Sequence, residues 1–577
     1  MPVFPGKDPA APLIVLDAYA ARTCVMKTWN RFAPDVHPPA PAPDEGLRES
    51  FAGGIRFADQ ALEELLHASS GSIADLRPLN DERWDVQEQA CAEALRHGVG
   101  IIIGGLLPLD VTGHRSGRPN LLVRGSDRPD GATGYHPVVI ARRQAAEKRL
   151  SGRRDYAVPV SGLAEPAYAR AEPVADRALR TQRDGTLLQA AHYWRLLEGA
   201  GHAAPGAPVA GILGTDSYPG HETPAITWVD LTEPMVRTFS RSAEEGWRLR
   251  SVLERYDHEH GFRVRIAEDA ASGQPASVAP IRNRECDACH WWEVCRPLLG
   301  DDDLSVRIDK APLDVREIQA LRALGVRTIT DLAEVDLEQL KMRYLPEVRH
   351  RQAAEQRLEL AAHRARLMVE EVDLERLTTG PIPIPGAELE IDFDIETAAD
   401  ERVYLWGFLV NDTRTDDPPR FVEFSAWTDL DAAAEIELAR RAMGWLRTVV
   451  TGPASVRVFH YSNYELVRLG NLANAAGDPL LDWAIDYAQR EFCDLFEVVR
   501  DHFFGTRGLG LKVVASVGAG FSWRDEDPGG LNSQAWFDEA CHAADPAVRA
   551  AARTRVLAYN EDDVRATWRL REWLRGL

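Results

Sequence analysis

The sequence has no long apolar run and no signal-like start. Its longest apolar stretch, residues 98–109, is twelve residues long and contains a Gly-Gly pair, whereas a membrane-spanning helix needs about 20 apolar residues. The N-terminus lacks the basic-then-apolar pattern of a secretory signal. We therefore predict a cytoplasmic protein with no membrane partner.

Positive charge and cysteine are also scarce. Lys and Arg number 67 against 89 Asp and Glu, which gives a formal net charge of −22 at pH 7. This balance argues against a protein coated for non-specific nucleic-acid binding, although it leaves room for a local basic groove. The seven cysteines are odd in number and unevenly clustered, which argues against a disulfide framework.

What the chain does contain is the composition of an ordinary globular protein, with 45% apolar and 27% charged residues. At 577 residues it is too long for one core, so three to four domains are expected.

The segment 389–397 alternates apolar and acidic residues. On a strand, Leu389, Ile391, Phe393 and Ile395 share one face, and Glu390, Asp392, Asp394 and Glu396 share the other. Four carboxylates on one face repel one another unless a cation lies over them, and hard divalent cations prefer carboxylate oxygens. The alternative is a solvent-facing edge strand.

A second motif, C-x2-C-x5-C, occupies residues 286–295. Thiolates gathered this closely bind a metal or a cluster. On spacing alone, an iron–sulfur cluster and a structural zinc site fit equally well, the latter completed by His290 or by a fourth cysteine.

Cys24 followed far downstream by C-x2-C-x5-C resembles the iron–sulfur staple of RecB-like nucleases, which include the AddB subunit and CRISPR-associated relatives. The resemblance implies a restriction-endonuclease-like PD-(D/E)XK α/β domain over residues 1–300. It also implies a mainly structural 4Fe–4S cluster that ties the two ends of this domain together, with the ligands Cys24, Cys286, Cys289 and Cys295.

The catalytic set of that family is incomplete here. Asn120 stands where the family has Asp, and Val139 and Ala141 stand where it has an acid and a Lys, whereas Gln189 and Tyr193 match its Gln-x3-Tyr motif. Since the chemistry needs two carboxylates and a Lys, we predict a degenerate centre that serves as a DNA-binding platform. A shifted alignment that keeps this centre active is a less favoured alternative.

Two further stretches are candidates for phosphate contacts. Basic residues between 141 and 154 (Arg142, Arg143, Lys148, Arg149, Arg153 and Arg154) form either a phosphate contact or a solvated helix face. Residues 318–332 have the pattern of two helices joined by a Gly-containing turn. They resemble a helix-hairpin-helix, with an ordinary αα-hairpin as the alternative, inside a helical connector over residues 301–385.

Residues 386–577 resemble the RNase H-like 3′–5′ exonucleases of the DEDDy type, and are most similar to the YprB-like domain that is fused to RecB-like nucleases. Asp394-Ile-Glu396-Thr matches the first motif of that family. Tyr559 and Asp563 match its Tyr-x3-Asp motif, one helical turn apart. Glu465 stands where the second motif has Asp, and Asp494 resembles a further family element.

The resemblance implies that Asp394, Glu396, Glu465 and Asp563 hold two divalent ions, Mg²⁺ or Mn²⁺, about 4 Å apart. Tyr559 would orient the attacking water, because its ordinary pKa near ~10 makes it a poor base. These five residues are the predicted catalytic set.

We therefore predict an α/β multidomain, metal-dependent nuclease: a hydrolase whose C-terminal domain degrades nucleic acid, DNA in the first instance, in repair or recombination. A helicase or another repair factor is a candidate partner. The alternative is a catalytically inactive nucleic-acid-binding scaffold in which both centres have decayed.

Expected helices cover 16–29, 57–67, 84–97, 182–197, 349–368, 430–450 and a last helix from 556. Expected strands cover 98–107, 118–124, 134–141, 228–231, 389–397, 403–410, 421–424 and a segment from 456, and Ser516 is expected in a loop.

Overall fold

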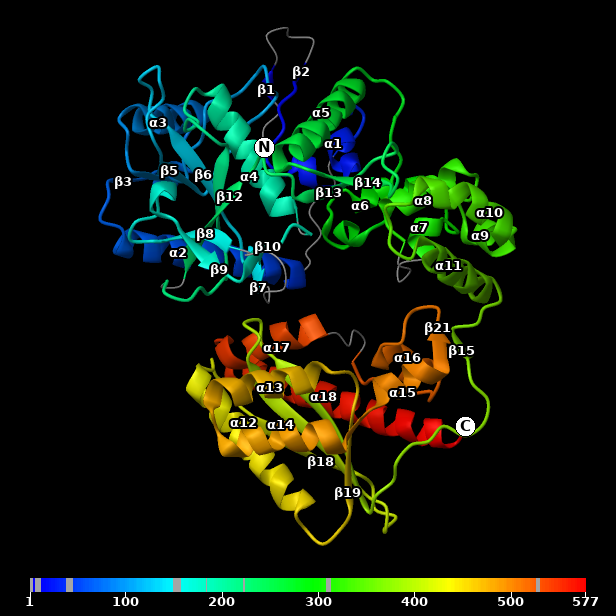
Figure 1. Cartoon of the computed structure of the whole chain (residues 1–577). Coiled ribbons are helices and arrows are strands. Elements are labelled where there is room, and N and C mark those ends of the chain that lie inside the picture. The colour runs from blue at the N-terminus through cyan, green and yellow to red at the C-terminus, as the bar shows by residue number, and fades with distance from the viewer. Residues whose placement is uncertain are drawn as a thin grey trace.

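The computed structural model describes residues 4–5, 12–37, 45–148, 157–182, 184–221, 224–307, 313–525 and 530–577. Figure 1 shows two bodies, each built around a β-sheet, and a group of helices that follows the first body in the chain. The protein is thus a mixed α/β multidomain chain, as predicted. Within these described ranges, no helix is both long enough and apolar enough to cross a membrane.

The N-terminal body contains an eight-stranded sheet in the order β3-β4-β5-β6-β11-β12-β8-β9. The strands are β3 (Ile73–Asp75), β4 (Ile101–Ile103), β5 (Leu121–Arg124), β6 (Tyr135–Ile140), β8 (Ala157–Gly162), β9 (Glu172–Ala175), β11 (Val209–Leu213) and β12 (Ala225–Asp230). The pairs β3–β4 and β6–β11 are parallel. The other neighbours are antiparallel.

Helices cover both faces of this sheet. From α2 (Glu45–Ala68), Leu65 packs in one cluster with Ile101 and Ile103. Ile102 joins the opposite cluster, which contains α3 (Trp84–Arg96) and α4 (Gly185–Gly199). Because side chains alternate between two buried faces, these strands read as continuous apolar runs in the sequence.

The last part of this body returns to its beginning. The helix α5 (Val252–Ala271) packs on α1 (Val25–Phe32), and the short α6 (Trp292–Cys295) joins the same cluster. A hairpin of β13 (Val236–Phe239) and β14 (Trp247–Arg250) precedes α5.

Two expected elements of this body are shorter than the sequence pattern suggested. The helix over 16–29 is wrong: a short 3-10 turn (Ala20–Arg22) precedes α1, and Cys24 lies between them in an extended conformation with ψ 131°. The strand over 98–107 is limited to β4, because the chain turns at Gly104, whose φ of +65° suits glycine.

The connector is helical. It contains α7 (Leu304–Arg307), α8 (Val315–Ala323), α9 (Ile329–Glu334), α10 (Leu337–Tyr344) and α11 (Ala354–Val369). The expected helix–turn–helix is α8 and α9, joined through Gly325 at φ +94°. Both helices begin with a capping box, Asp314 with Glu317 and Thr328 with Asp331.

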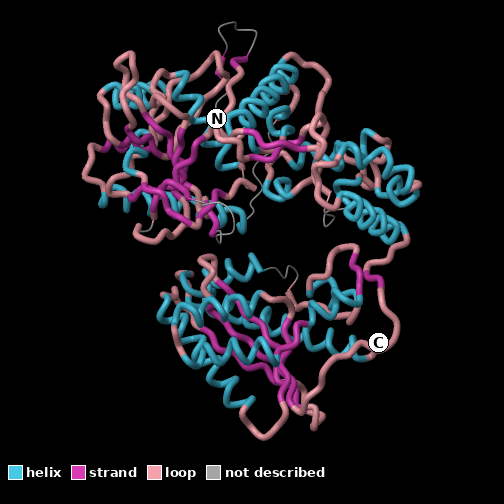
Figure 2. The backbone as a smooth tube through the Cα atoms, in the orientation of Figure 1, coloured by secondary structure: helices cyan, strands magenta, loops and turns pink. Residues whose placement is uncertain are grey.

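The C-terminal body contains a five-stranded sheet in the order β18-β17-β16-β19-β20 (Figure 2). Its strands are β16 (Leu389–Thr397), β17 (Val403–Asp412), β18 (Arg420–Ser425), β19 (Val456–His460) and β20 (Phe492–Asp494). The first three form an antiparallel meander, and β16, β19 and β20 run parallel. The strand β16 is therefore central, not an edge strand.

Different helices cover the two faces of this sheet. Ile391, Phe393 and Ile395 pack against α12 (Ala432–Val450), α13 (Tyr464–Ala476) and α14 (Pro479–Glu491). The acidic face of β16 lies under α18 (Pro546–Arg575), the last helix of the chain. The period-two pattern of 389–397 thus predicted both faces of the strand.

Three expectations outside the sheets need correction or fall outside the described ranges. Ser516 lies in α16 (Leu511–Val517), not in a loop. The last helix begins ten residues earlier than residue 556. In the basic stretch, Lys148 lies on strand β7 (Ala146–Lys148), and Arg142 and Arg143 lie in a bend before it, so these residues form no helix face. Arg149, Arg153 and Arg154 lie outside the described residues.

Candidate active site

The four acids of β16 meet different partners along α18. At one end, Arg571 and Arg575 neutralise Glu390 and Asp392. Arg571 Nη2 lies 2.9 Å from Asp392 Oδ2, Arg575 Nη2 lies 2.6 Å from Glu390 Oε1, and Arg571 also contacts Glu390. Burial raises the pKa of Asp392 to about 6, and Arg571 opposes that rise. This end is a buried ion-pair network.

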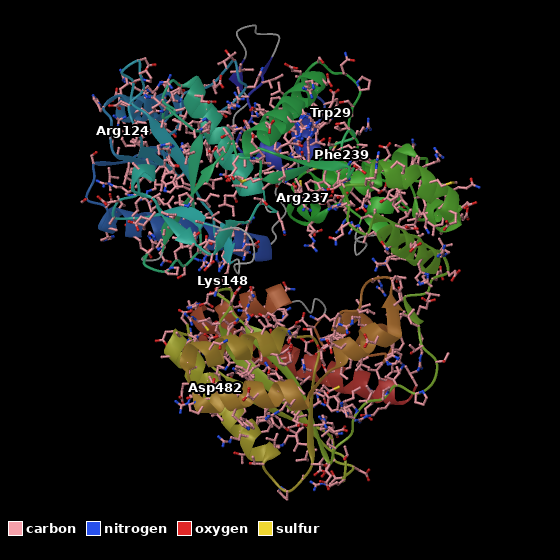
Figure 3. The ribbon with its side chains drawn as sticks, in the orientation of Figure 1. Trp29, Arg124, Lys148, Arg237, Phe239 and Asp482 are labelled. Carbon is pink, nitrogen blue, oxygen red and sulfur yellow. The ribbon has the colours of Figure 1, made fainter. Side chains whose placement is uncertain are left out.

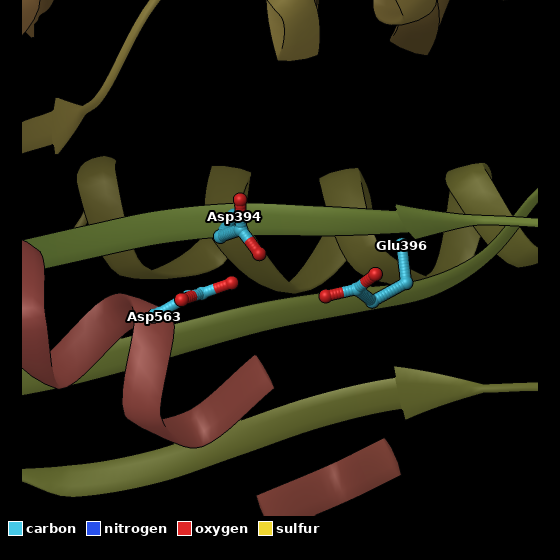
Figure 4. Close-up of side chains that lie close together, drawn as sticks. All are labelled: Asp394, Glu396 and Asp563. Atoms are coloured by element: carbon cyan, nitrogen blue, oxygen red, sulfur yellow. The ribbon is translucent and has the colours of Figure 1, made fainter. Parts of the chain in front are cut away.

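At the other end, α18 contributes an acid instead of a base. Ligand oxygens of Asp394, Glu396 and Asp563 all lie within 4.8 Å of one another (Figure 4). Among the described residues, this is the one group of three Asp, Glu, His or Cys side chains that meets this distance. The arrangement offers three carboxylates to a hard cation.

The three carboxylates of Asp394, Glu396 and Asp563 repel one another, so a nearby positive charge would stabilise their ionised forms. Burial, and then the charges of Glu396, Asp563 and Glu465, raise the pKa of Asp394 well above its ordinary value. Burial and Asp563 raise the pKa of Glu396 to about 8. Carboxylates this close cannot all be ionised without a compensating cation.

Neutral donors fix the orientation of each carboxylate. The hydrogen bonds run from Asn560 Nδ2 to Asp394 Oδ2 (2.7 Å), from Ser533 Oγ to Glu396 Oε2 (2.8 Å) and from Trp523 Nε1 to Asp563 Oδ1 (2.7 Å). They position the acids without neutralising them, in contrast to the arginines at the other end of the strand.

Gly407 on β17, paired in register with Asp394, makes room for one of these donors. A Cβ at this position would lie 1.7 Å from Asn560 Oδ1. Only glycine therefore lets α18 approach the sheet with Asn560 over Asp394.

Tyr559 lies one helical turn before Asp563 and is 4% exposed. Burial, and then the charges of Asp563 and Glu396, raise the pKa of its phenol above the ordinary value, so the hydroxyl stays neutral. Lys512 Nζ, from α16, donates a hydrogen bond of 2.7 Å to Tyr559 Oη. The phenol proton is then available to a second partner.

Lys512 was not among the residues singled out from the sequence. A compositional signal could have found it: Lys512 is the only lysine between residues 386 and 577, where every other basic side chain apart from histidine is an arginine. Its charge lowers the pKa of Asp563 against the effect of burial. Asn560, Ser533 and Trp523 carry no comparable signal, because the fold alone brings them to the acids.

Glu465, at the start of α13, lies beside this group but outside its 4.8 Å limit. It is 4% exposed, and its Oε2 atom has no hydrogen-bond partner among the described residues. The Nδ1 atom of His460 is 3.7 Å away, beyond hydrogen-bond distance, and contacts Ser462 O at 2.6 Å instead. His460 compensates this carboxylate only when its imidazole is protonated, and a cation from the Asp394 side would serve the same purpose.

Asp494 has a structural role. Its Oδ1 accepts hydrogen bonds from the backbone N–H groups of Ser462 and Phe496, each at 2.9 Å. It thus caps α15 (Leu495–His502) and ties it to the end of β19.

In the N-terminal body, the residues at the positions of the RecB-like catalytic motif do not form an acidic group like that of β16. Asn120 Oδ1 accepts a hydrogen bond from the Ile140 backbone N–H at 3.0 Å, and Val139 is buried in the core. Gln189 Oε1 accepts from Arg22 Nη1 at 2.9 Å. An amide bound to backbone and an amide bound to a guanidinium provide no carboxylate ligand here.

The four cysteines Cys24, Cys286, Cys289 and Cys295 line one small cavity, together with Trp291 and Trp292. Two N–H groups point at the sulfurs: Asn30 Nδ2 to Cys295 Sγ and the Asn283 backbone to Cys286 Sγ, each at 3.5 Å. His290 is not part of the lining. The fold therefore brings together the four cysteines singled out from the sequence.

Comparison with known proteins bears on the C-terminal body. A family model described as the RNase H superfamily matches residues 391–575. This part of the chain is an RNase H-like domain. Such a domain indicates nuclease-type hydrolysis of nucleic acid with divalent metals, which agrees with the acidic group. No curated protein and no solved structure matches the chain.

Proposed function

We propose that the RNase H-like domain is a 3′–5′ exonuclease that hydrolyses DNA phosphodiester bonds with two divalent cations, Mg²⁺ or Mn²⁺. The observation that carries this proposal is the group of Asp394, Glu396 and Asp563, which lies next to Tyr559 and has no arginine paired with it among the described residues. Bound cations would supply charge to this group and acidify a coordinated water.

In this proposal the acids bind the cations, and Tyr559 and Lys512 position the attacking water. Asp394, Glu396 and Asp563 would hold the cations, and Glu465 would close the set from α13 with its Oε2 atom, which accepts no hydrogen bond from the described residues. Tyr559, neutral and donating, would orient the attacking water. Lys512 fixes the phenol so that its proton points away from the ammonium group.

Release of nucleotides from the 3′ end of single-stranded DNA tests this proposal. A 5′-labelled strand should give a ladder that shortens from the 3′ end when Mg²⁺ or Mn²⁺ is present. The variants Asp394→Asn and Asp563→Asn should be inactive, and Asn120→Ala, in the other body, should keep wild-type activity. A preference for RNA would change the substrate, and activity that survives Asp394→Asn would refute the site.

For the cysteine cavity, we propose a 4Fe–4S cluster with a structural role. No three sulfurs of the described cysteines lie within 4.8 Å of one another. With Zn–S bonds of about 2.3 Å, tetrahedral zinc would hold its thiolates roughly 4 Å apart. A cluster spreads its thiolates over several irons and fits the wider spacing. Its loss should loosen the contact between α1 and α6.

The cluster has its own test. Anaerobically purified protein should show broad visible absorbance, and Cys289→Ala should lose it together with thermal stability. Cys91→Ala, in the sheet core away from the cavity, should keep the absorbance. Stoichiometric zinc in place of iron would refute the cluster.

The same proposal includes a RecB-like origin for the N-terminal body and a role for this body as a DNA-binding platform. It also includes a function in repair or recombination with a helicase partner. The second candidate function, an inactive scaffold, draws on the Asn120 contact with backbone and on Glu465 in place of Asp. DNA binding without nucleotide release under any metal would favour the scaffold.

A further inference from the structure

A cleft of about 850 Å³ lies between the β13–β14 hairpin, α5 and the start of α8. Figure 3 labels Arg237 and Phe239 on the hairpin, where the N-terminal body meets the connector helices. Seven arginines and five acids line the cleft. In a chain with a net charge of −22, such a concentration of guanidinium groups is a local exception.

The acids of the cleft are largely engaged with other groups. Glu254 caps α5, Glu259 pairs with Arg255 and Arg263, Asp314 pairs with Arg351, and Glu285 pairs with Lys27. By contrast, Arg237, Arg250 and Arg316 have no carboxylate within 4.0 Å in the part of the chain that the structure describes. The unbalanced charge of the cleft is therefore positive.

Aromatic rings hold two of these arginines in place. The guanidinium carbon of Arg316 lies 3.2 Å from the centre of the Phe239 ring, which also packs against His350 at 5.1 Å. Arg237 lies 4.2 Å from the centre of the Trp247 ring. A guanidinium stacked on a ring keeps its N–H edge available to an anion and loses little side-chain entropy on binding.

Arg316 is half-buried and has no ion-pair partner among the described residues. Burial, and then the neighbouring charge of Arg241, lower its pKa, and its Nε atom has no hydrogen-bond partner among the described residues. A phosphate group would satisfy this atom and compensate the like charges.

We infer that this cleft binds the phosphate backbone of single-stranded nucleic acid, at a site separate from the acidic group of the RNase H-like domain. Guanidinium groups interleaved with aromatic rings are typical of single-strand grooves. The inference rests on the proposed function insofar as nucleic acid is the substrate. The cleft would hold a long strand and leave the chemistry to Asp394 and its neighbours.

Fluorescence anisotropy with a labelled oligothymidine of about 20 nucleotides tests the cleft, with EDTA present to prevent cleavage. The triple variant Arg237→Gln, Arg250→Gln, Arg316→Gln should bind at least about tenfold more weakly. The slope of log K against log salt concentration should fall by about 2, since each lost phosphate contact accounts for roughly 0.7.

A matched triple variant controls for net charge. Arg83, Arg414 and Arg500 are exposed and pair with acids close to them in sequence. Their replacement by Gln removes the same charge from other surfaces and should change the affinity by less than about twofold. Equal losses in the two triple variants, or no loss in the cleft variant, would overturn the inference.

Folding and activity controls keep the result interpretable. Arg237→Gln alone changes an exposed side chain and should reproduce part of the loss, while the corresponding triple Lys variant should retain part of the binding. The cleft variant should cleave a thymidine dinucleotide at the wild-type rate, because this short substrate reaches only the acidic group. If the wild-type protein cleaves long DNA but the wild type and the triple Gln variant bind it with equal affinity, the cleft proposal is refuted and the nuclease proposal remains. Wild-type protein that neither binds nor cleaves would refute both.

Discussion

The two ends of one strand face differ in what the opposing helix supplies. Glu390 and Asp392 meet Arg571, which is fully buried, and Arg575. Asp394 and Glu396 meet Asp563, another acid. The residue types on β16 are nearly the same along its length. Whether a carboxylate of β16 enters an ion pair or an unneutralised group of acids is therefore decided by α18.

The spacing of α18 explains how one helix serves both ends. It runs along β16 in the opposite direction, so that its residue 563 lies at Asp394 and its residue 571, about two turns later, lies at Asp392. The arginines anchor the helix in register on the sheet. Anchored in this way, it brings Tyr559 and Asp563 to Asp394 and Glu396, where Lys512 contacts Tyr559.

The largest expected effect is at the unneutralised end. Asp394→Asn should reduce DNA hydrolysis by at least about 10³-fold, because a neutral amide is a poor ligand for a hard cation. The same change should leave the melting temperature of the metal-free protein unchanged or higher, because it relieves repulsion with Glu396 and Asp563. Single-turnover cleavage and calorimetry would measure the two effects.

An Asp394→Asn variant that is active, or that melts far below the wild type without metal, would contradict this assignment. It would mean that Asp394 contributes to the fold in the way that Asp392 does.

The opposite effect is expected at the arginine end. Arg571→Met should lower the free energy of unfolding by about 3–5 kcal/mol, because it leaves Asp392 buried without its arginine and Glu390 with Arg575 alone. Adding Glu390→Gln and Asp392→Asn to this variant should restore most of the loss. Denaturant unfolding of the wild type, the single variant and the triple variant measures these free energies. A loss below about 1 kcal/mol for Arg571→Met would show that this network is not a major source of stability.

The sequence predicted β16 well and its partners poorly. Alternation over nine residues is a local signal, and it correctly assigned the apolar and acidic faces. The Tyr-x3-Asp motif is also local, because one helical turn relates its residues. Which acids Arg571 neutralises depends on how α18 lies on the sheet, and no short-range pattern encodes that contact. Lys512 and Trp523 reach the site through loops and short helices for the same reason.

Boundaries failed where single residues override a pattern. Cys24 interrupts the expected helix over 16–29 with an extended backbone, and Gly104 ends β4 early with a positive φ. The four cysteines, which were grouped from their spacing and a family resemblance, line one cavity. Cys24 lies about 260 residues before the other three cysteines in the sequence, so the spacing within 286–295 could not show that it joins them in one cavity.

The N-terminal body contains a buried polar network built on two histidines, in contrast to the acids of β16. There, Arg115 Nε donates to Tyr256 Oη, which in turn lies 2.9 Å from His192 Nδ1. His192 Nε2 lies 3.0 Å from Ser116 O, and His260 Nε2 lies 2.9 Å from Gly113 O, both at ordinary hydrogen-bond distance. Burial lowers the pKa of His192 to about 3 and that of His260 to about 4. Both imidazoles are neutral at pH 7.

This core should make the N-terminal body sensitive to acid. Unfolded histidines titrate near about 6.5, so between pH 6.5 and pH 4 the unfolded state binds more protons than the folded state. Stability is therefore complete above pH 6.5 and is lost as the pH falls through this window, by up to about 1 kcal/mol per pH unit for each histidine. His260→Gln should reduce the slope in pH-dependent unfolding. An unchanged slope would place the acid sensitivity elsewhere.

The smallest expected effect concerns Lys512, the lysine that contacts Tyr559. Lys512→Met should lower kcat about tenfold and leave KM nearly unchanged, because Tyr559 loses the partner that fixes its hydroxyl but the acids remain. Lys341→Met, on the connector, removes the same charge and should have no effect on cleavage. Lys512→Arg is the more informative change. It places at this end the guanidinium that neutralises the other end, and a fork of N–H groups prefers paired carboxylate oxygens to a phenol. If Lys512 only balances charge, Arg should replace it fully. If Lys512 instead holds the hydroxyl of Tyr559 in place, Lys512→Arg should be nearly as slow as Lys512→Met. The two ends of β16 would then differ both in the number of basic side chains and in the geometry that each end requires of them.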